Sequence, residues 1–268
     1  MLFRNYGTDL RFARMFVPAL LKVSLRALWY VNLPTKLAML RMSLRRWLVW
    51  LPAKIRAWRE GIAPPVTLHV IDDVGCRAAC ANCVFTAFHD RRDRLSLDEL
   101  SGLLDQALAM NVTNIYLVGA DPFYRKDTEA FLEVLARHRY QYFLLFTEGQ
   151  EVAPAHLDQL RAAGNVALVL NIDGLEEATD QRKGKGSFAA QRELLDGLRQ
   201  RRMVFGVSSM TSTANVDEVT GEAFVRTLDD AGAYFLAYIP YSPVDRRAEA
   251  DLMLSDAQRD ELFERAQG

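Results

Sequence analysis

The chain has 268 residues, of which half are hydrophobic and a quarter are charged, so it can bury one sizeable core and still leave residues for an appendage. Its three cysteines lie close together, and this odd, clustered count argues against a secreted scaffold held by disulfides and suits a reducing cytosol. The net charge of −1 conceals an asymmetry, because residues 1–60 hold 12 of the 33 Lys and Arg residues but 2 of the 34 Asp and Glu residues. Two regions with different roles are therefore expected.

Residues 1–60 form the basic region, and all four tryptophans lie within it. Two amphipathic helices are expected, 8–31 and 35–60, separated by the run Asn32-Leu33-Pro34. Basic residues interrupt their apolar runs, so neither a signal peptide nor a transmembrane helix is predicted. Basic residues and tryptophan on such helices favour peripheral contact with the inner face of a membrane, while packing on the rest of the chain is an equally good interpretation. Nucleic acid is not expected as a partner, because the rest of the chain is acidic.

Residues 61–65 are typical of a linker, and beyond them six apolar strand-like runs alternate with amphipathic helical stretches. The expected strands are 66–73, 114–118, 141–146, 166–172, 203–209 and 233–241. The expected helices are 96–110, 128–138, 153–163, 186–201 and 216–231. Strand–helix alternation repeated six times predicts an α/β fold with a parallel sheet and helices outside it.

Six such units fit a partial (β/α)6 barrel of the TIM type over residues 66–241, preceded by the basic amphipathic helical segment. A doubly wound sheet is the alternative. In either fold the functional residues lie at the carboxyl ends of the strands. Residues 242–268 predict a turn and then a helix from about Ser255 that stops at Gly268. Two alternatives follow, a truncated chain or a protein without a further C-terminal extension.

Cys76, Cys80 and Cys83 form a C-x3-C-x2-C loop directly after the first expected strand. A cubane iron–sulfur cluster normally takes four thiolates, so three of them leave one iron open to a small molecule. A zinc site with His89 as the fourth ligand is the alternative, although zinc sites more often use C-x2-C pairs.

Polar or glycine-containing runs also lie at or directly after the end of each of the next four expected strands. They are Gly119-Ala120-Asp121-Pro122, Thr147-Glu148-Gly149, Asn171-Ile172-Asp173 with the later run Asp180–Phe188, and Ser208-Ser209. Polar residues that alternate at a strand end point into the mouth of a barrel. These runs are therefore expected to meet the cysteine loop.

In this order the runs resemble those of the radical S-adenosylmethionine (SAM) enzymes, and most of all their MoaA-like and PqqE-like branch, over residues 66–240. The resemblance implies that Cys76, Cys80 and Cys83 hold a catalytic [4Fe-4S] cluster. It also implies a SAM site in which the Gly119–Pro122 run stands where the family has Gly-Gly-Glu-Pro and meets the SAM ammonium. The remaining implied contacts are Phe85 on the adenine, Asn171 and Asp173 on the ribose, Ser208 on the ribose or the substrate, and Arg182 or Lys183 on the SAM carboxylate.

The resemblance implies a cytoplasmic enzyme that takes one electron from a flavodoxin- or ferredoxin-type reductant. SAM is then cleaved to methionine and a 5′-deoxyadenosyl radical, which abstracts hydrogen from a substrate that the sequence does not identify: a small molecule, a lipid or a peptide. Three residues depart from the family pattern, Asn82, Ala120 and Glu148. A non-catalytic iron–sulfur or zinc-binding protein on the same fold is therefore the alternative function, and a membrane-surface interaction protein is a third.

Overall fold

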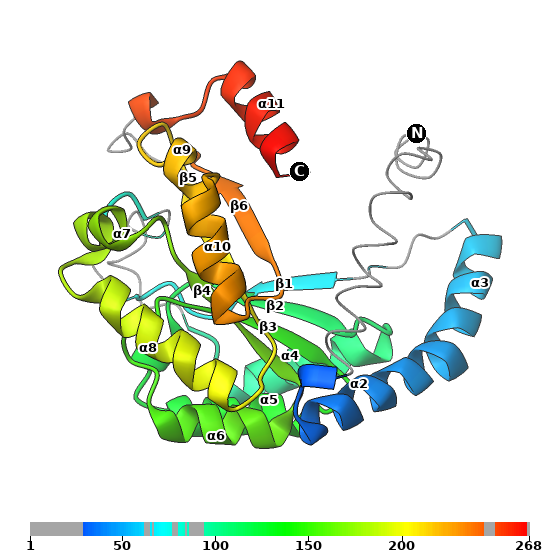
Figure 1. Ribbon diagram of the computed structural model, residues 1–268. Coiled ribbons are helices and arrows are strands. Elements are labelled where there is room, and N and C mark those ends of the chain that lie inside the picture. The colour runs from blue at the N-terminus through cyan, green and yellow to red at the C-terminus, as the bar shows by residue number, and fades with distance from the viewer. Residues whose placement is uncertain are drawn as a thin grey trace.

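The computed structural model describes residues 29–61, 65, 67–76, 80–83, 85, 94–243 and 250–266 (Figure 1). The expected helix over 8–31 lies outside the described residues except for 29–31, and His89 lies outside them as well. No helix within the described ranges is long and apolar enough to cross a membrane.

Six parallel strands form one curled sheet in the order β1-β2-β3-β4-β5-β6. They are β1 (Thr67–Ile71), β2 (Asn114–Val118), β3 (Tyr142–Thr147), β4 (Val166–Asn171), β5 (Phe205–Thr211) and β6 (Leu236–Pro240). Each strand pairs with the next one in the sequence, whereas a doubly wound sheet reverses its strand order partway. The expected partial barrel is therefore confirmed.

Helices cover the outer face of the sheet (Figure 1). They are α4 (Leu97–Ala109), α5 (Thr128–Arg137), α6 (Pro154–Ala163), α7 (Glu176–Lys183), α8 (Ser187–Gln200), α9 (Val216–Val219) and α10 (Glu222–Ala231), with the 3-10 turn η3 (Pro122–Tyr124) after β2. Large side chains between the sheet and these helices are fully buried, among them Phe131, Phe143, Phe205 and Phe224. Burial of this apolar surface is the main stabilising term of the fold.

Two helical expectations need correction. The stretch 216–231 is not one helix, because Gly221 adopts an extended conformation (φ −72°, ψ 149°) and separates α9 from α10. Helix α7 was not expected as a helix, and residues 180–183 of the polar run after β4 belong to it. At the carboxyl end, η4 (Ala250–Leu252) precedes α11 (Asp256–Arg265), which begins directly after Ser255, close to the expected start, and is capped by that residue.

The described part of the basic region is a long helical arm that extends beside the barrel (Figure 1). It consists of α2 (Leu33–Arg45), the π-helical turn η1 (Arg46–Trp50) and α3 (Leu51–Arg59), so the helix begins slightly before the expected residue 35. Within η1 the N–H of Leu51 donates to the carbonyl oxygen of Arg46, five residues earlier. Because Pro52 has no N–H to donate, the π turn shifts the hydrogen-bond pattern where the helix would otherwise be interrupted.

Candidate active site

A pocket of about 510 Å³ lies at the carboxyl ends of the strands. Nine of the residues expected from the sequence line it: Cys76, Cys80, Cys83, Phe85, Gly119, Asp121, Asn171, Asp173 and Arg182. Ala120, Pro122 and Ser208 do not line the pocket and lie buried behind it. The structure thus brings the strand-end runs together, as their positions predicted.

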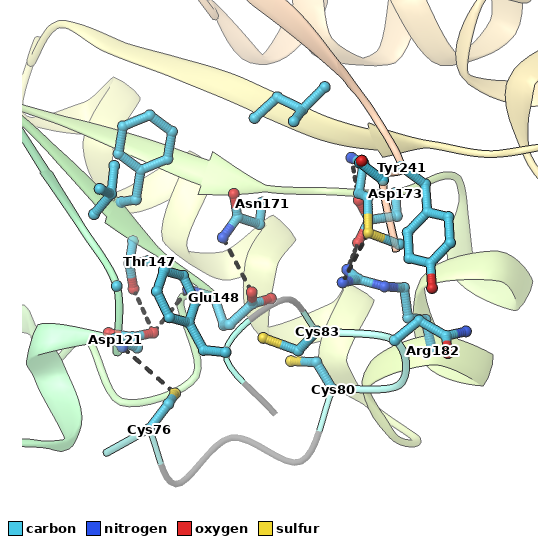
Figure 2. Close-up of a pocket in the computed structure, with 18 of the residues that line it drawn as sticks. Cys76, Cys80, Cys83, Asp121, Thr147, Glu148, Asn171, Asp173, Arg182 and Tyr241 are labelled. Atoms are coloured by element: carbon cyan, nitrogen blue, oxygen red, sulfur yellow. Dashed lines mark hydrogen bonds and ion pairs between the residues drawn. The ribbon is translucent and has the colours of Figure 1, made fainter. Parts of the chain in front are cut away.

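The three cysteines are half-buried and all face this pocket (Figure 2). Burial, followed by the nearby Glu148 carboxylate, raises the pKa of the Cys80 thiol to about 12, and a bound metal reverses such an effect because it deprotonates the thiol outright. Across the described ranges, no three His, Cys, Asp or Glu side chains are placed to hold a single metal ion. Three thiols on one loop, in a chain without a fourth cysteine, fit a cluster with one open iron.

The turn after β1 supports the turn after β2 through Asp73. The N–H of Gly75 donates to Oδ1 of Asp73 at 2.7 Å, and the N–H of Ala120 donates to the carbonyl oxygen of Asp73 at 2.8 Å. Gly119 has φ +129°, and a Cβ built on it would stand 2.4 Å from the Asp73 carbonyl oxygen. Only glycine therefore fits at this position.

The carboxylate of Asp121, a residue that lines the pocket, binds the turn after β3. Its carboxylate accepts hydrogen bonds from the N–H of Phe123 (3.0 Å), from Oγ1 of Thr147 (2.9 Å) and from the N–H of Glu148 (2.7 Å). Burial raises the pKa of Asp121 to about 6, although these hydrogen bonds lower it. The N–H of Asp121 lies 3.5 Å from the sulfur of Cys76, so the same residue connects the cysteine loop to β3 (Figure 2).

Two departures from the family pattern have a backbone explanation. Asn82, directly before the third cysteine, has φ +56°, which is the left-handed region where asparagine and glycine are tolerated better than other residues. Ala120 is not among the described residues with positive φ, so its position does not need a glycine for conformational reasons. Neither substitution distorts the turn that carries it.

The third departure, Glu148, belongs to a group of four charged side chains, here called the ion-pair group: Glu148, Asp173, Arg182 and Lys183. Nζ of Lys183 lies 2.5 Å from Oε2 of Glu148 and 3.0 Å from Oδ2 of Asp173, and its side chain is completely buried. Burial lowers the pKa of Lys183, but Glu148 and Asp173 outweigh burial and raise it. The carboxylate of Glu148 therefore has a buried lysine as its ion-pair partner within the protein.

Arg182 connects this group to the cysteine loop. Its guanidinium pairs with the Asp173 carboxylate, and its Nε donates to the carbonyl oxygen of Ala81 at 3.1 Å. The N–H of Ala81 donates in return to the carbonyl oxygen of Arg182 at 3.0 Å. The end of α7 thus holds the backbone between Cys80 and Cys83.

Asn171 joins the ends of three strands. Its Nδ2 donates to Oε1 of Glu148 at 3.0 Å, and its Oδ1 accepts from the hydroxyl of Ser208. Ser208 is 1% exposed, so it orients Asn171 and has no surface on the pocket. Of these two expected ribose contacts, only Asn171 has access to a ligand.

Sequence reasoning missed Lys183 as the partner of Glu148. The available signal was the acidic residue itself, because a carboxylate at a buried strand end needs a cation nearby. The pairing could not be located from spacing, since residues 148 and 183 lie on different elements and α7 carries no apolar periodicity.

Comparisons with known proteins agree with this site. Residues 71–231 match the Radical SAM superfamily. The mycofactocin maturase MftC of Mycolicibacterium smegmatis is 23% identical over 170 residues, which are 63% of this chain and 43% of that protein. The PqqA peptide cyclase of Ruegeria pomeroyi is 27% identical over 191 residues, 68% of this chain and 50% of that protein. The chain therefore spans about half the length of these relatives, or less.

Solved structures show the same fold. SuiB of Streptococcus suis bound to S-adenosylmethionine matches with a TM-score of 0.66 and 16% identity, over 78% of this chain and 49% of that one. The enzyme anSMEcpe, solved with bound AdoMet and a peptide, matches with a TM-score of 0.58 and 16% identity, over 75% of this chain and 58% of that one. With the cysteine loop, the pocket and these matches in agreement, the chain belongs to the radical SAM superfamily, in its MoaA-like and PqqE-like branch, whose members are enzymes that use a [4Fe-4S] cluster and SAM.

Proposed function

We propose that this protein cleaves SAM reductively and uses the resulting 5′-deoxyadenosyl radical to take a hydrogen atom from a substrate. The observation that carries the proposal is the meeting of all three cysteines with the ends of β2, β3 and β4 in one pocket. When bound to these cysteines, a cluster with one open iron supplies the electron that cleaves the sulfonium bond.

The residues of the chain have three tasks in this proposal. Cys76, Cys80 and Cys83 hold the cluster, and the turn at Gly119 brings backbone carbonyl groups close to the SAM ammonium. Phe85 packs on the adenine, and Asn171 hydrogen-bonds the ribose. The stacked rings of His69 and Tyr116, whose centroids lie 4.6 Å apart, form part of the pocket wall.

Asp121 and Arg182 contribute differently from what the resemblance implies. Both side chains already have partners within the protein, Asp121 at the β3 turn and Arg182 at Asp173 and Ala81. We infer that their main contribution is to position the two loops that surround SAM. Arg182 still lines the pocket and is the one Arg or Lys among its described lining residues, so it is our candidate partner for a SAM carboxylate.

A peptide is our first candidate for the substrate. The matched PqqA peptide cyclase is named for a peptide substrate, and SuiB has been solved bound to the precursor peptide SuiA. A small molecule is the second candidate, since a GTP 3′,8-cyclase of Campylobacter curvus is 27% identical over 123 residues. We propose a flavodoxin- or ferredoxin-type reductant as the electron donor. A cytoplasmic location with peripheral membrane contact through residues 1–60 also stays a proposal.

The test is an anaerobic assay of the full chain after reconstitution with iron and sulfide. SAM and dithionite are added, and 5′-deoxyadenosine is quantified for the wild type and for Cys76→Ala, Cys80→Ala and Cys83→Ala. We expect product from the wild type alone. A reconstituted cluster that yields no 5′-deoxyadenosine would support the non-catalytic alternative, and a preparation that binds zinc in place of iron would support the zinc alternative.

A further inference from the structure

The helical arm (residues 33–59) carries an apolar stripe that faces away from the core. Seven large side chains form it at steps that repeat on one helical face: Leu33, Leu37, Leu40, Leu44, Trp47, Leu48 and Ile55. Every one of them is exposed, and Trp47 and Leu48 reach 69% and 74%. Such a contiguous exposed apolar surface marks an interaction site.

The opposite face of the arm is the one that docks on the barrel. Thr35 and Ala38 are buried, and the N–H of Asn32 donates to the carbonyl oxygen of Arg202 at 3.0 Å. Pro34 lies so close to Gly164 that a Cβ there would stand 2.5 Å from the Pro34 carbonyl carbon. The start of the arm is therefore docked on the barrel through the face opposite its apolar stripe.

Charge distinguishes the possible occupants of this stripe. Residues 29–59 contain seven basic residues and no acidic residue: Lys36, Arg41, Arg45, Arg46, Lys54, Arg56 and Arg59. On a helical projection of α2, Lys36 flanks the stripe on one side and Arg41 flanks it on the other, where the Arg41 Nε donates to the carbonyl oxygen of Arg139 at 2.7 Å. Arg59 lies at the far end of α3. Lys54 and Arg46 also lie over the ring of Trp50, at 4.4 and 5.8 Å from its centroid.

We propose that the arm lies flat on an anionic lipid surface, with the apolar stripe among the acyl chains and the basic flanks on the phosphates. A second arm, or the basic residues 1–28, would bring like charge to this surface, whereas an anionic bilayer supplies both acyl chains and negative headgroups. A groove of about 400 Å³ lies between Leu37, Leu40, Leu44 and Tyr140, with the guanidinium groups of Arg41 and Arg45 over the Tyr140 ring. It offers apolar side chains to an acyl chain and two cations to a phosphate. Tryptophan at the boundary is typical of such helices.

This placement leaves the active site accessible. The arm begins beside Gly164 and Arg202, which precede β4 and β5, so it lies at the amino ends of the strands. The pocket lies at the carboxyl ends. A protein bound through the arm therefore keeps the pocket away from the bilayer, where an electron donor and a substrate can reach it. The proposal does not depend on SAM cleavage.

The test is co-sedimentation of the full chain with phosphatidylglycerol vesicles and with phosphatidylcholine vesicles. We expect binding to the anionic vesicles at low salt and weaker binding at 1 M salt, because salt screens the basic flanks. Lys36→Ala with Arg59→Ala should lower the apparent affinity by about 25-fold, since one basic residue near such a surface contributes about fivefold. Trp47→Ala with Leu48→Ser should lower it by at least about tenfold.

Matched controls alter equally exposed residues elsewhere. Phe263→Ser on α11 controls for the apolar change, and Arg192→Ala with Arg226→Ala on α8 and α10 controls for charge. Both controls should bind like the wild type, and all variants should still cleave SAM in solution, so the two proposals can fail separately. Absence of vesicle binding at low salt would overturn the membrane proposal. So would stripe variants that bind unchanged, or an association between copies of the chain that the stripe variants abolish.

Discussion

Arg182 and Ala81 hold each other by two hydrogen bonds that run in opposite directions, one between their backbones at 3.0 Å and one from the Arg182 side chain at 3.1 Å. Ala81 directly follows Cys80, so this pair fastens the cysteine loop to the end of α7. The Arg182 guanidinium is fixed in turn by Asp173, whose other carboxylate oxygen accepts from the N–H of Met210 at 2.7 Å. The loop is thereby connected to β4 and β5.

Arg182→Ala should weaken retention of the cluster, because it removes the side-chain half of this clamp. Partners that orient metal ligands typically contribute roughly 10- to 100-fold in metal affinity. Iron and sulfide per chain after gel filtration measure the effect, with Lys185→Ala as a control that changes an exposed cation of the same segment. An Arg182→Ala protein that keeps its full cluster and loses only SAM affinity would show that Arg182 binds the SAM carboxylate instead.

Lys183→Met should destabilise the fold by about 3–5 kcal/mol, because it leaves the carboxylates of Glu148 and Asp173 buried without their shared cation. Combining it with Glu148→Gln should restore a large part of the loss. Urea unfolding of the cluster-free chain measures both variants. A double variant as unstable as Lys183→Met alone would mean that the Glu148–Lys183 pair is not the source of the effect.

Gly119→Ala should destabilise the protein by about 1–3 kcal/mol, since it forces a side chain into a positive-φ position against the carbonyl oxygen of Asp73. Gly102→Ala is the matched control, because that glycine lies inside α4 with no atom near its added Cβ. The control should stabilise the chain by about 0.5–1 kcal/mol through helix propensity. Thermal unfolding of both variants measures whether the two changes in stability have opposite signs. Equal changes would contradict the close approach of the turns after β1 and β2.

The contribution of Asp173 should depend on pH in the acid range. Burial raises its pKa, but Lys183 and Arg182 outweigh burial and hold the pKa below its ordinary value of 3.8. The unfolded chain then binds more protons below that pH, so the free energy of unfolding falls as the pH drops further. Asp173→Asn should flatten this part of the stability curve. A variant with the same slope as the wild type below pH 4 would exclude this contribution.

The strands were predictable because each is a short, continuous apolar run, which is typical of a sheet buried on both faces. β2 agrees with its expected residues at both ends, whereas β5 begins at Phe205 and ends at Thr211, so that both of its ends lie two residues later than expected. Helix α7 escaped prediction because its sequence, EEATDQRK, has no apolar periodicity. It is fixed instead by tertiary contacts of Arg182 and Lys183.

The site was predictable to the extent that strand ends converge in any parallel barrel. Position along the chain indicated that Cys76, Gly119 and Asn171 would meet at one pocket. It could not indicate which polar side chains would pair with one another, since those pairings depend on how deeply each side chain is buried and on the direction in which it points. Asp121 and Ser208 were therefore assigned to the ligand, although both side chains are engaged within the protein.

The central claim is that the three cysteines hold a cluster whose fourth iron is open to SAM. The most direct measurement is the electron paramagnetic resonance spectrum of the reduced, reconstituted chain before and after addition of SAM. The account predicts a [4Fe-4S] signal that changes on adding SAM, because SAM binds the open iron. A cluster signal that stays the same with SAM present, or a chain that assembles no cluster, would contradict it.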